Sequence, residues 1–125
     1  MTFTPQNFVV WAEIPTTDMK RAMAYYAKVT GAKLTLDDTG PNPIAIFPTD
    51  NPARAVAGHI YPGTPAAKGT GPTIHLAAYG GLEQTLGRVA EAGGQVLSEP
   101  ISIPAGRFAY TIDLDGNSIG FFETL

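Results

Sequence analysis

The chain of 125 residues contains no cysteine. Disulfide bonds, thiolate nucleophiles and cysteine-based zinc or iron–sulfur sites are therefore excluded. Only two histidines are present, His59 and His75, so a metal site built from three histidines is excluded as well. The net charge is −3 and no run of basic residues marks a nucleic-acid surface. We expect no nucleic acid among the partners of this protein.

Long apolar runs are missing too. No segment approaches the roughly 20 apolar residues that a bilayer-spanning helix needs. The first ten residues lack the basic and apolar parts of a signal peptide. These absences predict a cytoplasmic protein without a membrane partner. The length corresponds to one domain, which would bury roughly two-thirds of its unfolded surface.

One pattern of elements occurs twice along the chain. Each half begins with a short apolar strand, Trp11–Ile14 and Thr73–Leu76, and continues with a helix-length segment that ends in glycine. The two strands are 62 residues apart. A repeat of this length predicts two copies of one supersecondary unit. Two such units that face each other enclose a cleft, and we place the function in that cleft.

The first half predicts the element order β-α-β-β-β. Phe8–Ile14 has the apolar pattern of a strand covered on both faces, and Pro15 is expected to end it. Thr16 or Thr17 would then cap a helix, with Asp18 in the first turn, and Gly31 would end that helix. Three further strands are predicted at Lys33–Leu36, Ile44–Phe47 and Ala55–Tyr61.

Segment 62–72 predicts a linker, because its three prolines and three glycines rule out a regular element. The pattern then restarts with a helix over 82–92, and a loop is expected at Pro100–Gly106. The predicted strands are Thr73–Ala78, Gln95–Leu97, Arg107–Leu114 and Ser118–Glu123. The chain is therefore predicted to be one α+β domain of two βαβββ modules, 1–61 and 73–125, whose curled mixed sheet surrounds the cleft.

Three segments resemble the vicinal oxygen chelate superfamily, the fold of glyoxalases, bleomycin resistance proteins and extradiol dioxygenases. These segments are Trp11–Ala22 with Tyr25, Tyr26 and Gly31, then Ala92–Leu97, then Asp113–Glu123 with its Asp-Gly-Asn turn. The opening Trp-x-Glu-Ile-Pro is most similar to a glyoxalase-related branch. The resemblance implies the two-module fold, a homodimer and a small-molecule ligand in the cleft.

Metal-binding members of that superfamily take their ligands from the first and last strand of each half. The resemblance places these positions at Trp11, Gly58, Thr73 and Gly120. None of the four has an imidazole or a carboxylate. We therefore expect no metal and no other cofactor, and neither metal-dependent glyoxalase I nor dioxygenase chemistry.

A carboxylate and an imidazole lie one step along the same strands. Because side chains alternate between faces, Glu13 shares a face with Trp11, and His75 shares a face with Thr73. If those faces line the cleft, Glu13 and His75 form a catalytic acid–base pair. Alternatively they form a structural pair, in which each satisfies the hydrogen bonds of the other.

Other residues are candidates for binding the substrate. An aromatic set either lines the cleft or fills the core. Arg107 follows a loop that would aim it at an anionic group, although solvation at the surface is the commoner fate of an arginine. His59 directly follows Gly58 and is therefore expected to point away from the cleft. The substrate-binding candidates are Trp11, Thr73, Arg107, Tyr110 and Phe122.

Two functions of different class follow from these residues. One is a metal-independent enzyme, a lyase or isomerase that moves a proton on a small organic molecule, with Glu13 and His75 as the acid–base pair and Arg107 as an anion anchor. The other is a non-catalytic protein that sequesters a drug or metabolite, as the bleomycin resistance members do. Loss of Glu13 and His75 would abolish the first function and spare the second.

Overall fold

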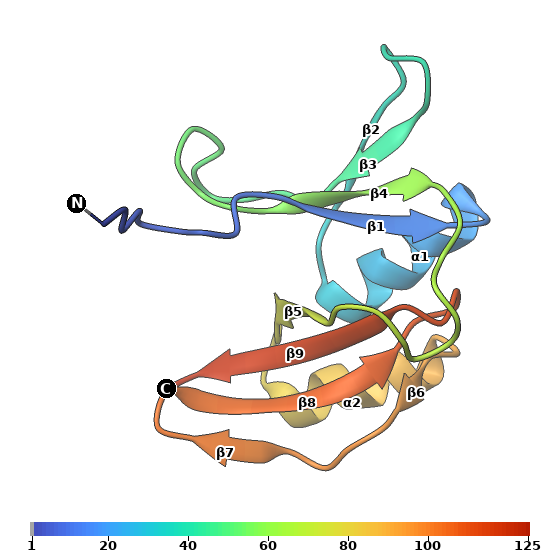
Figure 1. The fold of residues 1–125 in the computed structure, drawn as a ribbon. Helices are drawn as coiled ribbons and strands as arrows, with labels where there is room; N and C mark the ends of the chain where they lie inside the picture. Colours follow the sequence, from blue (N-terminus) through green and yellow to red (C-terminus); the bar gives the residue numbers. More distant parts are fainter. Residues whose placement is uncertain (1) are drawn as a thin grey trace.

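The computed structural model describes residues 2–125 and confirms an α+β fold of two modules (Figure 1), of which the first is βαβββ and the second has the additional strand β7. Module one contains β1 (Ala12–Thr16), α1 (Met19–Thr30), β2 (Thr35–Asp37), β3 (Ile44–Ile46) and β4 (Gly58–Pro62). Module two contains β5 (Ile74–Ala77), α2 (Leu82–Glu91), β6 (Gln95–Val96), β7 (Ile101–Ile103), β8 (Gly106–Ile112) and β9 (Ser118–Thr124). Neither helix has the length and apolarity that a membrane crossing needs.

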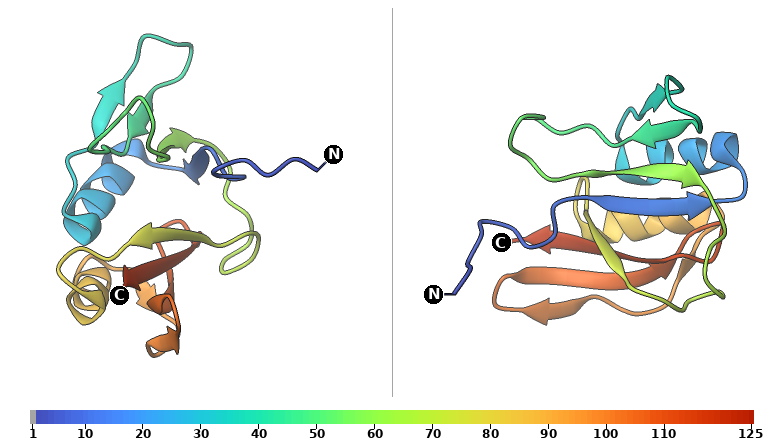
Figure 2. Two further views of the ribbon diagram at one scale, coloured as in Figure 1. Left: turned by 90° about the vertical axis from the view of Figure 1, so that its left-hand side faces the viewer. Right: turned by 45° about the horizontal axis from the view of Figure 1, so that its top comes forward.

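Each module forms its own mixed sheet. The strand order is β1-β4-β3-β2 in sheet A and β5-β9-β8-β6 in sheet B, where β7 also pairs with β8. In both sheets the first strand of the module pairs in parallel with its last strand, and the other pairs are antiparallel. Figures 1 and 2 show the two sheets as separate layers. Within residues 2–125, β1 and β5 are therefore edge strands, each with one side that pairs with no other strand.

One hydrophobic core joins the two modules. Ile14 of β1 and Ile60 of β4 are buried in the same cluster as Tyr26 and Val29 of α1. Module two contributes Leu82, Val89, Ala109, Ile119 and Phe121 to this cluster. Because side chains alternate along a strand, the intervening residues face away from the core. We call these outward surfaces the open faces of sheets A and B.

The start of α1 differs from the prediction. Asp18 is the N-cap residue, and its Oδ1 accepts a hydrogen bond of 3.1 Å from the backbone N–H of Arg21. The hydroxyl of Thr16 donates instead to Asp115, at 2.6 Å, because β1 continues through Pro15 to Thr16. A proline is tolerated there because β1 is an edge strand. The prediction of Gly31 as the end of the helix is confirmed by its left-handed φ of 72°.

Several predicted strand boundaries differ from the structure, and two of the differences are large. The strand expected at Phe8–Ile14 begins only at Ala12, and Phe8, Val9 and Val10 are 75%, 71% and 67% exposed. Figures 1 and 2 show this N-terminal arm running away from the body of the molecule. The loop expected at Pro100–Gly106 contains strand β7, which pairs with β8. Apolar residues 8–10 have strand propensity but no neighbouring strand to pair with.

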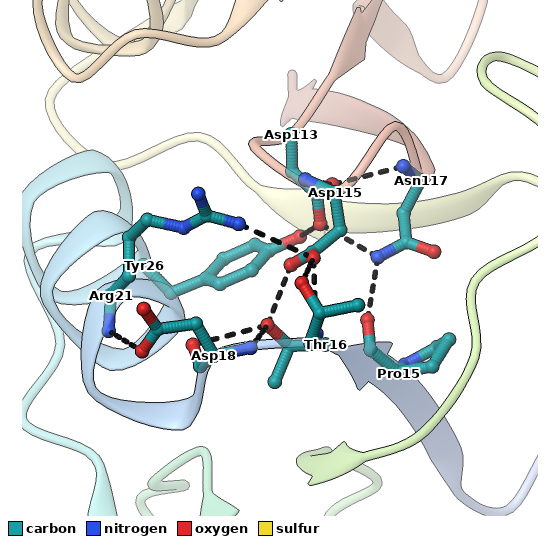
Figure 3. Close-up of polar contacts among 9 residues, drawn as sticks. Pro15, Thr16, Asp18, Arg21, Tyr26, Asp113, Asp115 and Asn117 are labelled. Carbon is teal, nitrogen blue, oxygen red and sulfur yellow. Dashed lines mark hydrogen bonds and ion pairs between the residues drawn. The ribbon is translucent and has the colours of Figure 1, made fainter.

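A polar network fastens the β8–β9 turn of module two to module one (Figure 3). The buried carboxylate of Asp113 accepts a 2.5 Å hydrogen bond from the hydroxyl of Tyr26. The side-chain amide of Asn117 donates to the carbonyl of Pro15 at 2.8 Å. Burial, followed by the charge of Asp113, raises the pKa of Tyr26, so its phenol remains a donor. The network thereby fixes the end of β1 and α1 against module two.

The neighbouring carboxylate of Asp115 completes this contact. It accepts hydrogen bonds from the backbone N–H and the hydroxyl of Thr17, at 3.0 and 2.8 Å, besides the bond from Thr16. Arg21 lies 3.5 Å away. Burial opposes ionisation of Asp115, but the hydrogen bonds from Thr16 and Thr17 outweigh it and lower the pKa of this carboxyl.

Candidate functional site

Three side chains form a hydrogen-bonded chain on the open face of sheet A. The indole Nε1–H of Trp11 donates to Nδ1 of His59 over 2.8 Å. The other ring nitrogen of His59, Nε2, lies 3.2 Å from Oε1 of Glu13. Strand pairing brings them together, since Glu13 and His59 are direct register partners on β1 and β4. We call these three residues the Trp11–His59–Glu13 chain.

Strand register decides the face of sheet A on which His59 lies. Gly58 pairs with Ala12 and is buried on the core side, which leaves His59 on the open face with Glu13. In module two the register differs by one residue, because His75 pairs with Gly120. The sequence repeat aligns Gly58 with Gly120, yet the two glycines lie on opposite faces of their sheets. The sequence contains a signal for the position of His59, because this polar residue lies between Gly58 and Ile60, which are both buried on the core side of β4.

The hydrogen bonds of the Trp11–His59–Glu13 chain determine which ring nitrogen of His59 carries the proton. An indole N–H can only donate, so Nδ1 of His59 accepts and carries no proton. The ring proton is then on Nε2, from which it is donated to Glu13. The His59 side chain is 13% exposed and that of Glu13 is 65% exposed. The result is a neutral, oriented imidazole that holds one oxygen of an accessible carboxylate.

Aromatic rings surround His75 on the open face of sheet B. Its ring meets Phe108 and Tyr110 edge-on, with centroid distances of 5.5 and 5.8 Å. Phe108 stacks on Phe122 at 6.0 Å with an interplanar angle of 5°. The ring of His75 lies over Gly120, where a Cβ atom would overlap it. Tyr110 and Phe122 thus occupy the same face as His75, half-buried rather than in the core.

Glu13 and His75, the predicted acid–base pair, line different cavities. Glu13 borders a hollow of about 170 Å³ between the modules, together with Thr70 and Ser118. His75 borders an apolar cavity of about 360 Å³, whose other lining residues include Ile14 and Leu76. The hydrogen bond of Glu13 goes to His59. The structure does not bring the carboxylate and the imidazole of that pair together in either the catalytic or the structural form.

Thr73 and Arg107 are engaged elsewhere. The hydroxyl of Thr73 lies 2.5 Å from that of Ser118. Arg107 lies on the helix-facing side of β8, opposite Tyr110, and its guanidinium binds the carboxylate of Glu83 through two bonds of 2.7 and 2.8 Å. Glu123 accepts further bonds from Arg107. The hydrogen bonds from Arg107 lower the pKa of Glu83 to about 2.

Glu123 also caps α2. Its Oε1 accepts a hydrogen bond of 2.8 Å from the backbone N–H of Leu82, where Gly81 provides no side-chain cap. This bond, then the bond from Arg107, lowers the pKa of Glu123. The ion pairs of Arg107 therefore hold α2 on sheet B, and the structure does not place this arginine with the residues of the open face.

A family model described as the Glyoxalase/Bleomycin resistance protein/Dioxygenase superfamily matches residues 8–121. The chain belongs to this superfamily. No curated protein is similar enough in sequence to count as a match.

Several solved structures share the fold. The hypothetical protein SA1046 from S. aureus has a TM-score of 0.68 at 18% identity, over 94% of this chain and 97% of that one. The fosfomycin resistance protein FosX from Listeria monocytogenes gives 0.71 at 13% identity, over 98% and 94%. Glyoxalase I from Zea mays gives 0.69 at 17% identity, over 90% of this chain and 44% of the maize enzyme. At these identities the likeness shows the fold alone.

The residues of this superfamily member do not fit a metal. Within residues 2–125, no three histidine, aspartate or glutamate side chains come together. The four positions that the resemblance assigns to ligands have no imidazole or carboxylate; they are Trp11, Gly58, Thr73 and Gly120. Glu13 and His59 provide two groups that could ligate a metal, but both ring nitrogens of His59 are already hydrogen-bonded. A catalytic zinc ion typically takes three protein ligands.

Proposed function

We propose that this superfamily member binds a small organic molecule on its open sheet faces and acts on it as a metal-independent lyase or isomerase that transfers a proton. The observation that carries the proposal is the Trp11–His59–Glu13 chain. It holds Oε1 of Glu13 in place, and no hydrogen bond from residues 2–125 reaches Oε2. A general base must combine a fixed orientation with access to the substrate, and Glu13 has both.

The chemistry that we propose needs only a proton acceptor. Oε2 of Glu13 takes a proton from a carbon next to a carbonyl of the ligand, and returns it to another atom of the same molecule. The Nε2–H of His59 keeps the carboxylate in position throughout. In an isomerisation the substrate regains one proton from Glu13, and in a lyase reaction that proton goes to the leaving group; in both cases the proton held on Glu13 exchanges with solvent between the two steps, and no oxidant, reductant or metal is required.

Deuterium exchange tests this function without a known product. A metabolite library is screened by thermal shift, and each ligand that stabilises the protein is incubated with it in D2O and followed by NMR. We expect one class of ligand to exchange a carbon-bound proton with solvent. Glu13→Gln should slow this exchange by about 100-fold or more, because general base catalysis contributes roughly that factor. Glu91→Gln, an exposed change on α2, should leave it unaltered.

The aromatic cluster of sheet B supports sequestration as a second candidate. The cluster offers rings on which a flat ligand could stack, and none of these rings is in contact with Glu13; its members are Phe108, Tyr110 and Phe122. Sequestration predicts ligands that bind with no exchange at carbon in the wild-type protein. Their affinity would then fall in Phe108→Ala and survive in Glu13→Gln. Exchange that persists unchanged in Glu13→Gln would reject the enzymatic proposal.

We also propose a homodimer, which the N-terminal arm and the free strand edges support. Phe8, Val9 and Val10 are exposed, and neither β1 nor β5 has a partner on its outer edge within residues 2–125. We expect the full chain to sediment as a dimer. Replacing both Phe8 and Val10 by aspartate should raise the dissociation constant by about 100-fold, since burial of each side chain is worth roughly 1.5–3 kcal/mol. Leu36→Asp, on β2, is the control; a monomeric wild-type chain would contradict the proposal.

A further inference from the structure

The charge of Glu13 has no cationic partner in the structure. Within residues 2–125, no lysine or arginine nitrogen lies within 4.0 Å of its carboxylate, and its ion-pair contact is with His59 alone. That imidazole is neutral as long as Nδ1 accepts from the indole of Trp11. By contrast, Glu83 and Glu123 both pair with Arg107. The open face of sheet A therefore presents a negative charge that its own hydrogen bonds orient but do not neutralise.

Aromatic surface lies next to this charge. Trp11 is 45% exposed although its N–H is bound to His59, so the ring is oriented and still accessible. Tyr61 is two residues beyond His59 on β4 and shares its face, and the two rings meet edge-on at 6.1 Å. The faces of indole and phenol rings attract cations through their quadrupoles. A carboxylate beside such rings is the combination that recognises an ammonium group.

We infer that Trp11, Glu13 and Tyr61 form a binding site for an organic cation, a protonated or quaternary amine. This inference rests on the proposed binding of small molecules at the open faces, and it names the class of ligand. An anionic ligand would be repelled by Glu13 at this site, and a neutral one would gain nothing from its charge. The cation lies over the aromatic rings and is held by the carboxylate, while His59 determines the direction of that carboxylate.

The experiment uses Trp11 as its own reporter, because it is the only tryptophan in the chain. Choline is titrated into the full-length protein while indole fluorescence is measured. The controls are the dimethylbutanol in which carbon replaces the choline nitrogen, and trimethylacetate as an anion. We expect saturable binding of choline, and binding of the neutral isostere that is about tenfold weaker, from the sum of cation–π and ion-pair contributions. Added salt should weaken choline binding.

Two variants separate the charge from general effects. Glu13→Gln should weaken choline binding by about fivefold, the upper range for an exposed ion pair. Glu99→Gln makes the same change in net charge at an exposed position outside this site, and should leave the affinity unaltered. Equal affinity for choline and its isostere, or equal affinity in Glu13→Gln and wild type, would overturn the inference.

Mapping by 1H–15N NMR distinguishes failure of this inference from failure of the proposed function. Ligands from the library that shift the signals around Phe108 and Tyr110, with no response of the Trp11 indole to choline, would leave small-molecule binding intact and reject the cation site. Absence of any ligand on either open face would reject both. A choline-induced shift of the Trp11 indole that is lost in Glu13→Gln supports the inference directly.

Discussion

Replacing Asp113 by alanine is expected to lower the free energy of unfolding by about 4 kcal/mol. Asp113 is 6% exposed, and its carboxylate accepts four hydrogen bonds. Its Oδ2 binds the hydroxyl of Tyr26 and the side-chain amide of Asn117. Its Oδ1 binds the backbone N–H groups of Asp115 and Asn117. Removing the acceptor leaves buried donors without partners, which costs more than the lost bonds themselves. Urea denaturation measures the change.

The matched control for this variant is Asp37→Ala. Asp37 accepts the same kind of local bonds, from the backbone N–H and hydroxyl of Thr39, but at the surface. Its replacement should leave the denaturation midpoint nearly unchanged. Tyr26→Phe should cost about 1–2 kcal/mol, and should cost less in the Asp113→Ala background because the two residues share one bond. A loss below about 1.5 kcal/mol in Asp113→Ala would show that the network is not what fastens the modules.

This network has a consequence for the candidate site. Asp113, Asp115 and Asn117 belong to module two, yet their partners include Pro15, Thr16 and Thr17 at the end of β1. Glu13 is two residues before Pro15 on the same strand. The turn of module two therefore sets the position of the strand that carries the carboxylate. Loosening the turn should disturb the Trp11–His59–Glu13 chain even though none of its members is touched.

The fold could be predicted because the evidence for it is repeated along the chain. Each of these signals concerns local structure, which nearby residues determine. They are the two apolar strands 62 residues apart, the two helix-length segments that follow them, and the Asp-Gly-Asn turn. Gly31 as a helix end is a local signal of this kind, and it is confirmed. The strand predicted at Phe8–Ile14 failed because strand formation also needs a partner. Residues 8–10 have none within the described chain.

The site was harder to predict because it depends on register between strands. Alternation states correctly that Trp11 and Glu13 share a face, but it does not say which residue of β4 lies opposite. The pairing of β1 with β4 places His59 beside Glu13. Position 59 corresponds in the repeat to Phe121, which is fully buried. The two modules share a sequence pattern but differ by one residue in the register between their first and last strands. A register shift of one residue moves a side chain to the opposite face of the sheet.

Arg107 illustrates a different limit. It is three residues from Tyr110 on β8, an odd separation, so alternation alone would have put the two on opposite faces. The structure has that arrangement, with Arg107 facing Glu83 and Glu123. The ion pairs themselves could not be predicted, since Glu83 is on α2 and Glu123 is on β9. Only the packing of that helix on the sheet brings the three residues together.

Gly58→Ala is expected to lower the free energy of unfolding by about 3 kcal/mol, the cost of overpacking a site that cannot relax. Gly58 is the register partner of Ala12 between two parallel strands. A Cβ atom there would overlap the carbonyl oxygen of Ala12 and lie 2.9 Å from its Cβ. The obstacle is backbone, so β1 and β4 must separate. Because Glu13 and Trp11 flank Ala12, the fluorescence of the indole should change in the same variant, which urea denaturation and emission spectra would show together.

Gly87→Ala is the control, because it makes the same substitution at a position where the added methyl group has room. Gly87 lies within α2, and a Cβ atom added there meets no other atom within 4 Å. Alanine at that position should raise the free energy of unfolding by about 0.5–1 kcal/mol, because glycine loses more backbone entropy than alanine when a helix forms. The same substitution should therefore have opposite signs at the two positions. A Gly58→Ala protein as stable as wild type would mean that β1 and β4 do not pair in this register, and the contact between His59 and Glu13 would then have to be abandoned with it.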